Sequence, residues 1–421
     1  MRKRHILILG DVHSVSAYMD FFENEYSIIT SEYEYRSMAA AIKYAVNVAY
    51  KLATPDVFDA SCFEHRMDEV LAYAAQIVEQ FGPLDCVVAT HEHTVLPAAI
   101  IRTHFQIQGL QANEAYALRD KNKMKQKISE YGLPIPKFAH VEQHHYPQQI
   151  DDFLNQFDTI VIKPANQGGS QGVLVTSNKD KVQLHIEQLL QQTNNISLEQ
   201  YINLPTMHID GVMCKGDIHF LSVSSYVGSC YNFVHHRTNI GSVIHNDKQL
   251  YDRAKQYAEQ CLAAFQIESL VFHLELFEQD LDNFIFLEMA GRYVGAGMTK
   301  LIDNVFGFDL VKASYDLDCL HPIDRNYSET MLATIKPSGV LLIPSPIKKS
   351  IRVKGISGLG ELPHNVAASE FAGPGSTILF SNIESFKTLA RITITDDTIA
   401  SIKSTMAQLN DRVQFVYEEV Q

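Results

Sequence analysis

The chain of 421 residues contains no tryptophan, and its six cysteines form neither a CxxC pair nor any short regular spacing. The cysteines therefore indicate neither a zinc ribbon nor a disulfide framework, and a reducing cytoplasm suits them best. The absence of tryptophan excludes no class of protein, because tyrosine and phenylalanine supply the aromatic side chains.

Basic charge and long apolar runs are also scarce. The chain has 35 Lys and Arg against 49 Asp and Glu, a net charge of −14, and no basic cluster, which disfavours nucleic acid and anionic lipid as partners. No apolar run approaches the roughly 18 residues that span a bilayer, and Ile6–Leu9 is too short for the core of a signal peptide. We expect a cytoplasmic protein that binds neither nucleic acid nor membrane.

The first part of the chain alternates between strand and helix patterns, which is typical of a small doubly wound α/β domain. The turn at Gly10 lacks the further glycines of a GxGxxG fingerprint, so a dinucleotide site is not indicated. A helix is predicted over 61–81, with Ser61 and Glu64 as a capping box. Thr90–His93 follow the next strand, where open α/β sheets place ligand contacts.

The remainder of the chain divides by pattern. One helix is predicted from Ala115 to Gly132, and many Val, Ile, Gly and Pro residues after Met331 indicate a β-rich end with a helix near 397–410. The expected fold class is α/β, with a doubly wound N-terminal domain and a β-rich C-terminal subdomain. We expect four parts: residues 1–114, 115–196, 197–325 and 326–421.

A lysine ends the apolar strand Thr159–Lys163, and a glycine-rich loop follows it. A buried ammonium must find an anion or reach water, because its desolvation is costly. The backbone N–H groups of Gly168–Gly172 could fold over phosphate oxygens, although no Walker Gly-Lys-Ser/Thr is present. The alternative is a surface hairpin whose lysine extends into solvent.

Two glutamates lie in apolar strands joined by a short turn, Gln279–Asn283. The resulting hairpin could bring Glu275 and Glu288 together, and paired carboxylates repel unless a cation such as Mg²⁺ or Mn²⁺ lies between them. Arg292 adds a planar cation suited to phosphate or carboxylate. Ordinary salt bridges are the alternative.

Several other polar residues leave two interpretations open. Residues 196–202 and 208–211 look like a strand and its connector, for which edge-strand structure is the default. His273 could orient the neighbouring Glu275 or a phosphate. The segment His235–Arg237 could contact a substrate carboxylate or form a plain polar loop.

Taken in order, these motifs resemble the ATP-grasp superfamily. The ordered set is Asp120-Lys121, Lys163 with its glycine loop, Glu199-x-Tyr201-Ile202, and the two glutamate strands followed by Arg292. Within that superfamily, the chain looks like the carboxylate–amine ligases that include L-amino acid (dipeptide) ligases. The segments that carry this closer likeness are Glu92-x-x-x-Leu-Pro-Ala-Ala, Arg119-Asp120-Lys121 and the Gly-Ser-x-Gly-Val loop.

The resemblance covers nearly the whole chain and implies an ATP-grasp fold with a role for each matching residue. The implied ligands of Mg²⁺ or Mn²⁺ are Glu275 and Glu288. The implied catalytic residues are Arg292, Lys163 and His273. The implied ATP-binding residues are Lys121, Lys163, Gly168, Gly169, Ser170, Gly172, Glu199, Tyr201 and Ile202. Two positions depart from the family, since Thr206 replaces an acid that contacts ribose and Ala290 replaces an asparagine.

The resemblance implies ATP-dependent ligation of a carboxylate to an amine through an acyl phosphate, with small-molecule substrates that we expect to be amino acids. Because an acyl phosphate hydrolyses in water, a lid is needed, and the candidates are the glycine loop and residues 197–270. The resemblance also allows a homodimer. A biotin-carboxylase-like ATP-dependent carboxylase and a non-catalytic ATP-binding regulator stay open as alternatives.

Overall fold

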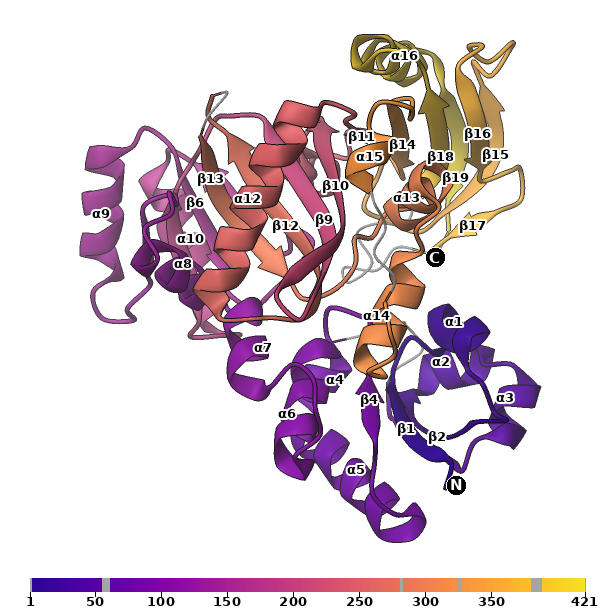
Figure 1. Ribbon diagram of the computed structural model, residues 1–421. Helices are drawn as coiled ribbons and strands as arrows, with labels where there is room; N and C mark the ends of the chain where they lie inside the picture. The colour runs from indigo at the N-terminus through magenta and orange to yellow at the C-terminus, as the bar shows by residue number, and fades with distance from the viewer. Residues whose placement is uncertain (1, 55–60, 281–282, 324–327, 380–387, 421) are drawn as a thin grey trace.

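The computed structural model describes residues 2–54, 61–280, 283–323, 328–379 and 388–420. The architecture is mixed α/β, with the N-terminal domain at the bottom of Figure 1, a small sheet at the left and the C-terminal strands at the upper right. Among the described residues, no helix is long and apolar enough to cross a membrane. All six cysteines are free thiols.

The N-terminal domain is a parallel sheet with the strand order β3-β2-β1-β4, as its alternating pattern predicts. Its strands are β1 (Arg4–Leu9), β2 (Asn24–Ser31), β3 (Val48–Leu52) and β4 (Cys86–Val88). Its helices are α1 (Val12–Val15), the 3-10 turn Ser16–Tyr18, α2 (Glu32–Ser37), α3 (Ala40–Ala45), α4 (Cys62–His65), α5 (Met67–Phe81) and α6 (Val95–Phe105).

The predicted helix over 61–81 is interrupted, and its predicted capping box is wrong. The segment forms α4 and α5, and the Ser61 side chain makes no cap hydrogen bond. The Glu64 carboxylate instead accepts hydrogen bonds from Arg119, 55 residues further along the chain. An ion pair to a distant arginine therefore replaces the local bond that the sequence pattern predicts.

A small antiparallel sheet follows, with the strand order β5-β8-β6-β7. Its strands are β5 (Phe138–His140), β6 (Ile160–Pro164), β7 (Leu174–Thr176) and β8 (Ile196–Gln200). The helices α9 (Tyr146–Gln156) and α10 (Lys179–Leu190) share a hydrophobic core with it. The glycine loop joins β6 to β7, so its base is fixed by two paired strands.

The predicted helix from Ala115 to Gly132 is two helices, α7 (Ala112–Arg119) and α8 (Lys121–Glu130). Asp120 lies between them in an extended conformation, and its carboxylate accepts hydrogen bonds from the N–H groups of Asn122 (2.9 Å) and Lys123 (3.1 Å). This cap starts a new helix at Lys121, because a side-chain acceptor satisfies N–H groups that lack partners in the first turn.

The central sheet has eight strands in the order β13-β12-β9-β10-β11-β14-β18-β16, and all neighbouring pairs are antiparallel. Its strands are β9 (Thr206–Cys214), β10 (Asp217–Val227), β11 (Ile240–Ile244), β12 (Leu270–Glu278), β13 (Phe284–Ala290), β14 (Ser338–Pro344), β16 (Val366–Phe371) and β18 (Thr388–Thr395).

The structure of this region bears on two expectations for the middle of the chain. The edge-strand default for 196–202 and 208–211 is wrong, because β8 lies between β5 and β6, and β9 lies between β12 and β10. Both strands thus have neighbours on each side. The lid stays a prediction, and the glycine loop is the candidate that lies outside the sheets, since most of 197–270 forms strands or helices.

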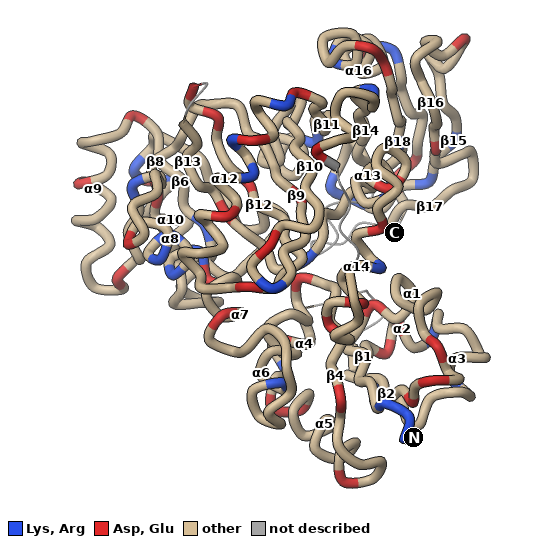
Figure 2. The backbone as a smooth tube through the Cα atoms, viewed as in Figure 1, with Lys and Arg blue, Asp and Glu red and all other residues tan. Residues whose placement is uncertain are grey.

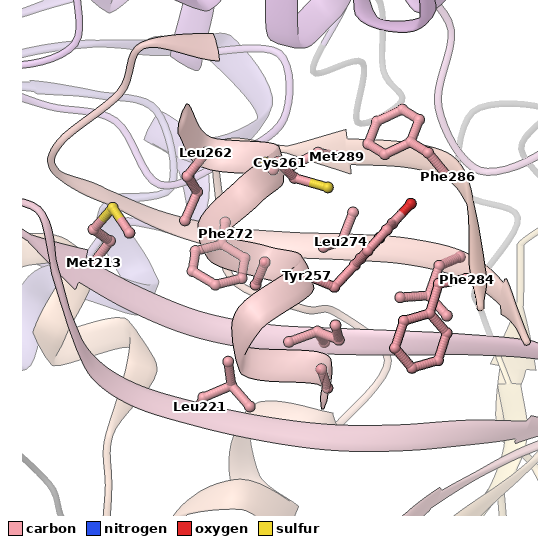
Figure 3. Close-up of a cluster of buried hydrophobic side chains, with 14 of the residues drawn as sticks. Met213, Leu221, Tyr257, Cys261, Leu262, Phe272, Leu274, Phe284, Phe286 and Met289 are labelled. Atoms are coloured by element: carbon pink, nitrogen blue, oxygen red, sulfur yellow. The ribbon is translucent and has the colours of Figure 1, made fainter. Parts of the chain in front are cut away.

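Helix α12 (Lys248–Phe265) covers one face of the central sheet. Tyr257, Cys261 and Leu262 of this helix lie over Phe272 and Leu274 of β12 in Figure 3, and all five are buried. The helix presents apolar side chains at a spacing of three or four residues. This core holds β12 and its neighbours in a fixed register.

The last part of the chain is rich in strands, as predicted. Strands β14, β16 and β18 extend the central sheet, while β15 (Ile351–Ser357), β17 (Thr377–Ile378) and β19 (Gln414–Glu419) form a separate sheet. The helix expected near 397–410 is α16 (Ile399–Arg412). The other helices are α11 (Cys230–His235), α13 (Met298–Phe306), α14 (Leu310–Asp318) and α15 (Ser328–Met331). The boundary expected at residues 325 and 326 lies outside the described residues, and the other expected boundaries stay predictions.

Candidate active site

A cavity of about 340 Å³ lies where the N-terminal domain, the glycine loop and the central sheet meet. Four segments far apart in the sequence supply much of its polar wall. These are Thr90–His93 after β4, Gly168–Gln171 of the loop, His273 with Glu275 of β12, and Glu288 with Arg292 in and after β13. The cavity thus collects many of the residues that the sequence analysis singles out.

Glu275 and Glu288 lie directly opposite each other in the β12–β13 pair, as the hairpin predicts. The turn between these strands includes residues 281–282, which lie outside the described residues. Glu275 accepts a hydrogen bond from the Tyr226 hydroxyl at 2.6 Å. Burial alone would raise its pKa, but His273 and then Tyr226 outweigh burial and lower the pKa of Glu275 to about 2. Glu275 is therefore a carboxylate at neutral pH.

His273 connects Glu275 to a buried ion-pair network. Its Nδ1 lies 2.7 Å from Asp210 Oδ1, and its Nε2 lies 3.5 Å from Glu275 Oε1. Burial lowers the pKa of His273, but Asp210 and then Glu275 raise it to about 9, so the ring is an imidazolium at neutral pH. The structure thus places His273 where it can orient Glu275, one of the two alternatives that the sequence leaves open.

His208 completes this network, and the sequence analysis assigns it no role. Its Nδ1 lies 2.7 Å from the second oxygen of Asp210, and its Nε2 lies 2.6 Å from Ser242 Oγ. In β9, His208 is the register partner of Glu275, and Asp210 is that of His273. His208 and Asp210 are two residues apart, so their side chains lie on the same face of β9. Only the pairing of β9 with β12 shows which side chains they contact.

The two predicted phosphate lysines both lie close to acidic groups. Lys121 Nζ is 3.1 Å from Glu288 Oε2 and 2.6 Å from the Gln167 carbonyl oxygen. Lys163 Nζ is 3.0 Å from Glu199 Oε2, and its side chain is buried, so the alternative of a lysine that extends into solvent is wrong. Burial lowers the pKa of Lys163, but Glu199 and then Glu288 raise it above its usual value. Lys163 is therefore an ammonium cation at neutral pH.

The Glu199 carboxylate lies between two lysines. It is 2 % exposed and contacts Lys125 at 2.9 Å as well as Lys163. Burial raises its pKa, but Lys125 and then Lys163 lower the pKa to about 2. The carboxylate thus orients Lys163, and the adenine contact implied for it stays a prediction. Lys125 follows Lys121 by one helical turn, a spacing that could have identified it.

The other residues implied for adenine and ribose lie beyond β8. The backbone N–H of Tyr201 donates to the Thr159 carbonyl oxygen at 3.3 Å, while its side chain is exposed. Ile202 is half-buried, and Thr206 begins β9 opposite Phe277. The nucleotide contacts of these residues stay predictions.

The glycine loop has two sides. Gly168, Gly169 and Ser170 line the cavity, whereas Gly172 lines a neighbouring cleft. Gly172 has φ +65°, and a Cβ there would lie 2.9 Å from the ring of Pro164, so glycine is required at this position. This close approach holds the end of the loop against β6.

Arg292 is held by a carboxylate from the segment that follows β4. Its Nε lies 2.5 Å from Glu92 Oε2, and the same carboxylate also pairs with Arg119. Burial raises the pKa of Glu92, but Arg292 and then Arg119 hold it well below its usual range. Glu92 and Glu64 thus tie the N-terminal domain to the site, through contacts that spacing along the chain does not reveal.

The donor set fits a divalent cation and a phosphate chain. Two carboxylates on adjacent strands are the oxygen ligands that Mg²⁺ prefers, and two buried lysines with a glycine loop suit phosphate oxygens. Ala290, at the end of β13, pairs with His273 and offers no side-chain ligand. The site could therefore hold magnesium through Glu275 and Glu288.

Comparisons with known proteins bear on the fold and on the segment that carries several of these residues. A family model described as "Sugar-transfer associated ATP-grasp" matches residues 101–204, the segment that carries Lys121, the glycine loop and Glu199. The structure is similar to an L-amino acid ligase from Bacillus licheniformis, with a TM-score of 0.71 at 15% identity over 100% of both chains. It is also similar to a biotin carboxylase from Campylobacter jejuni, with a TM-score of 0.63 at 13% identity over 99% of this chain and 92% of that one.

The fold is that of the ATP-grasp proteins, which confirms the predicted fold class. In sequence, the chain is 25% identical over 272 residues to the L-arginine-specific L-amino acid ligase of Bacillus subtilis, covering 62% of each chain. It is 20% identical over 279 residues to the alanine–anticapsin ligase of Bacillus subtilis strain 168, covering 60% of this chain and 57% of that one. The match spans about three fifths of these relatives' lengths. The predicted resemblance to the ATP-grasp carboxylate–amine ligases is confirmed.

Proposed function

We propose that the protein uses ATP to join a carboxylate to an amine, with amino acids as substrates. The observation that carries this proposal is the Glu275–Glu288 pair facing one cavity, with Lys121, Lys163 and Arg292 beside it. The names of the curated relatives, both ligases, support the reaction class.

In the first step, an oxygen of the substrate carboxylate attacks the γ-phosphorus of ATP. The P–O bond to the β-phosphate breaks, which gives an acyl phosphate and ADP. Lys121 and Lys163 offset the repulsion between the two anions and hold them in line. Magnesium bound by Glu275 and Glu288 would supply further neutralisation of the phosphate charge.

In the second step, the amine nitrogen attacks the acyl carbon, the amide bond forms, and the C–O bond to phosphate breaks. Negative charge develops on the carbonyl oxygen before phosphate leaves, and the planar Arg292 guanidinium is suited to stabilise it. The amine proton passes to solvent or to the departing phosphate. The glycine loop excludes water while the acyl phosphate is present.

Phosphate release from ATP and Mg²⁺, screened over pairs of amino acids with mass analysis of the products, tests the proposal. We expect stoichiometric phosphate and a product lighter by one water than the two substrates combined. Phosphate release only with bicarbonate and biotin would favour the biotin-carboxylase alternative. ATP binding without turnover under every pair would favour the regulator. The expected homodimer and cytoplasmic location stay predictions.

A further inference from the structure

A second cleft, of about 630 Å³, lies on the other side of the glycine loop. It shares Gln171 and Val234 with the catalytic cavity, so the two are neighbours along one wall. His235 joins them, because its Nε2 lies 2.9 Å from the Ser170 carbonyl oxygen and donates to it. The cleft and the cavity therefore adjoin each other at the glycine loop.

The charged side chains that line the cleft are all basic. Basic groups and amides line it, among them Arg237, Lys348, His65, His235, Gln167 and Gln171. Its described lining residues include no Asp or Glu, although the chain has 49 acidic and 35 basic residues and the acidic ones are spread over the fold (Figure 2). An acid-free lining with two full cations favours an anionic ligand.

Arg237 is the cation that the fold holds in place. It follows α11 with φ +57°, a left-handed conformation that glycine usually adopts after a helix. Its Nε donates to the Ser345 carbonyl oxygen at 2.8 Å, and no carboxylate of the described residues forms an ion pair with it. Burial lowers its pKa with no acidic neighbour to oppose the effect. A strained, half-buried and unpaired arginine is suited to an anion supplied by a ligand.

We propose that this cleft binds an additional carboxylate carried by one of the two substrates. That substrate is a dicarboxylic amino acid, or a short peptide that supplies the amine, and its non-reacting carboxylate meets the forked guanidinium of Arg237 and the ammonium of Lys348. The inference rests on the proposed function and narrows its substrate class. Of the predicted phosphate contacts, Gly172 borders the cleft, whereas Lys121, Lys163 and Gly168–Ser170 are not among its described lining residues.

Direct binding measured by calorimetry tests the inference without requiring turnover. Glutamate against glutamine reports a side-chain carboxylate, and Gly-Gly against its C-terminal amide reports a peptide terminus. Each is measured with Mg²⁺ and a non-hydrolysable ATP analogue present. We expect at least one acid to bind about tenfold more tightly than its amide. Equal affinity within both pairs, or no binding of any of the four, would overturn the proposal.

Three variants locate the carboxylate. Arg237→Asn removes the charge with a residue that tolerates the left-handed backbone, and Lys348→Gln removes the second charge. The matched control is Lys349→Gln in the same loop, whose ammonium pairs with Glu419 at 2.6 Å. We expect the acid-to-amide preference to fall at least fivefold in the first two variants and to persist in the control.

Two outcomes separate this inference from the proposed function. If the acid binds selectively and the first two variants lose that selectivity, but no partner substrate gives phosphate release, the proposed function fails and the cleft assignment stands. If ligation occurs but Arg237→Asn raises the KM for ATP without changing the acid-to-amide preference, the cleft serves the nucleotide and the inference is wrong.

Discussion

Among single residues, Glu275 and Glu288 carry the metal assignment. We predict that Glu275→Gln or Glu288→Gln lowers kcat at least a hundredfold, about 3 kcal/mol, because one of the two proposed charged ligands of magnesium is lost. The control is Glu278→Gln, at the last residue of the same strand as Glu275. Near-normal phosphate release in either site variant would contradict the assignment.

Arg292 gives a second prediction for a single residue. Its Nε already pairs with Glu92, so its guanidinium is oriented before substrate binds. Arg292→Lys keeps the charge but loses the forked geometry, so kcat should fall roughly a hundredfold while nucleotide affinity changes little. Both quantities are measured on the same variant. Weak ATP binding with normal kcat at saturation would place Arg292 at the nucleotide instead.

Among the secondary-structure elements, β11 brings a pH-sensitive group into the central sheet, since His245 directly follows it. Burial, and then Lys403, lower the pKa of His245 to about 4, so the ring is neutral in the folded protein at neutral pH. Because the folded pKa lies below the unfolded value of about 6.5, its contribution to stability is fully present above about pH 6.5 and is lost as pH falls toward about 4.

We therefore predict that the wild type loses up to about 2 kcal/mol more stability than His245→Gln between about pH 7.5 and pH 5. Urea unfolding at both pH values measures the difference. The exposed His144→Gln is the control and should retain the wild-type pH dependence. The same pH dependence in the wild type and in His245→Gln would show that this ring is not the sensitive group.

The elements also show how far the sequence could predict the site. The β12–β13 hairpin follows from two apolar runs and a short turn, and the pairing of Glu275 with Glu288 follows from the hairpin. The place of β9 beside β12 does not follow from the sequence. Two strands and two helices lie between β9 and β12 along the chain, and no local pattern selects the partner strand. The contacts of Asp210 are therefore out of reach of sequence reasoning, whereas an anionic partner for Lys163 is one of the two alternatives that the sequence offers.

Contacts between parts of the chain were the least predictable. Glu64 has the spacing of a capping box, yet its carboxylate pairs with Arg119 in another region. The helix break at Asp120 is likewise set by a cap that competes with a continuous apolar pattern. A sequence pattern indicates the partners that a side chain can find nearby in the chain. It does not show the partners from distant segments that the fold brings into contact with that side chain.

For the molecule as a whole, α14 joins the N-terminal domain to the central region. Figure 1 shows this helix between the two parts. Arg102 of α6 donates to Asp318 of α14 at 2.6 Å. The backbone N–H of Ala89 donates to the other oxygen of the same carboxylate at 2.9 Å. Asp318 thus anchors the segment that leads from β4 to Glu92, the residue that holds Arg292.

We predict that Arg102→Met lowers the free energy of unfolding by about 3 kcal/mol, because it leaves the largely buried Asp318 carboxyl without its cation. Arg36→Met, which removes a surface pair with Glu32, is the control and should cost about 0.5 kcal/mol or less. Urea unfolding of both variants checks this. Equal losses of unfolding free energy in the two variants would mean that the contact between α6 and α14 does not depend on this ion pair.

The proposed mechanism depends on an acyl phosphate that forms before the amide, and the transfer of a labelled oxygen is its sharpest test. A pair of substrates that supports ligation is supplied with ¹⁸O in the carboxylate, and the released phosphate is analysed by mass. The mechanism predicts one ¹⁸O atom in each phosphate, because the attacking carboxylate oxygen leaves with the phosphoryl group. Amide formation with unlabelled phosphate, or with the label in AMP, would contradict it.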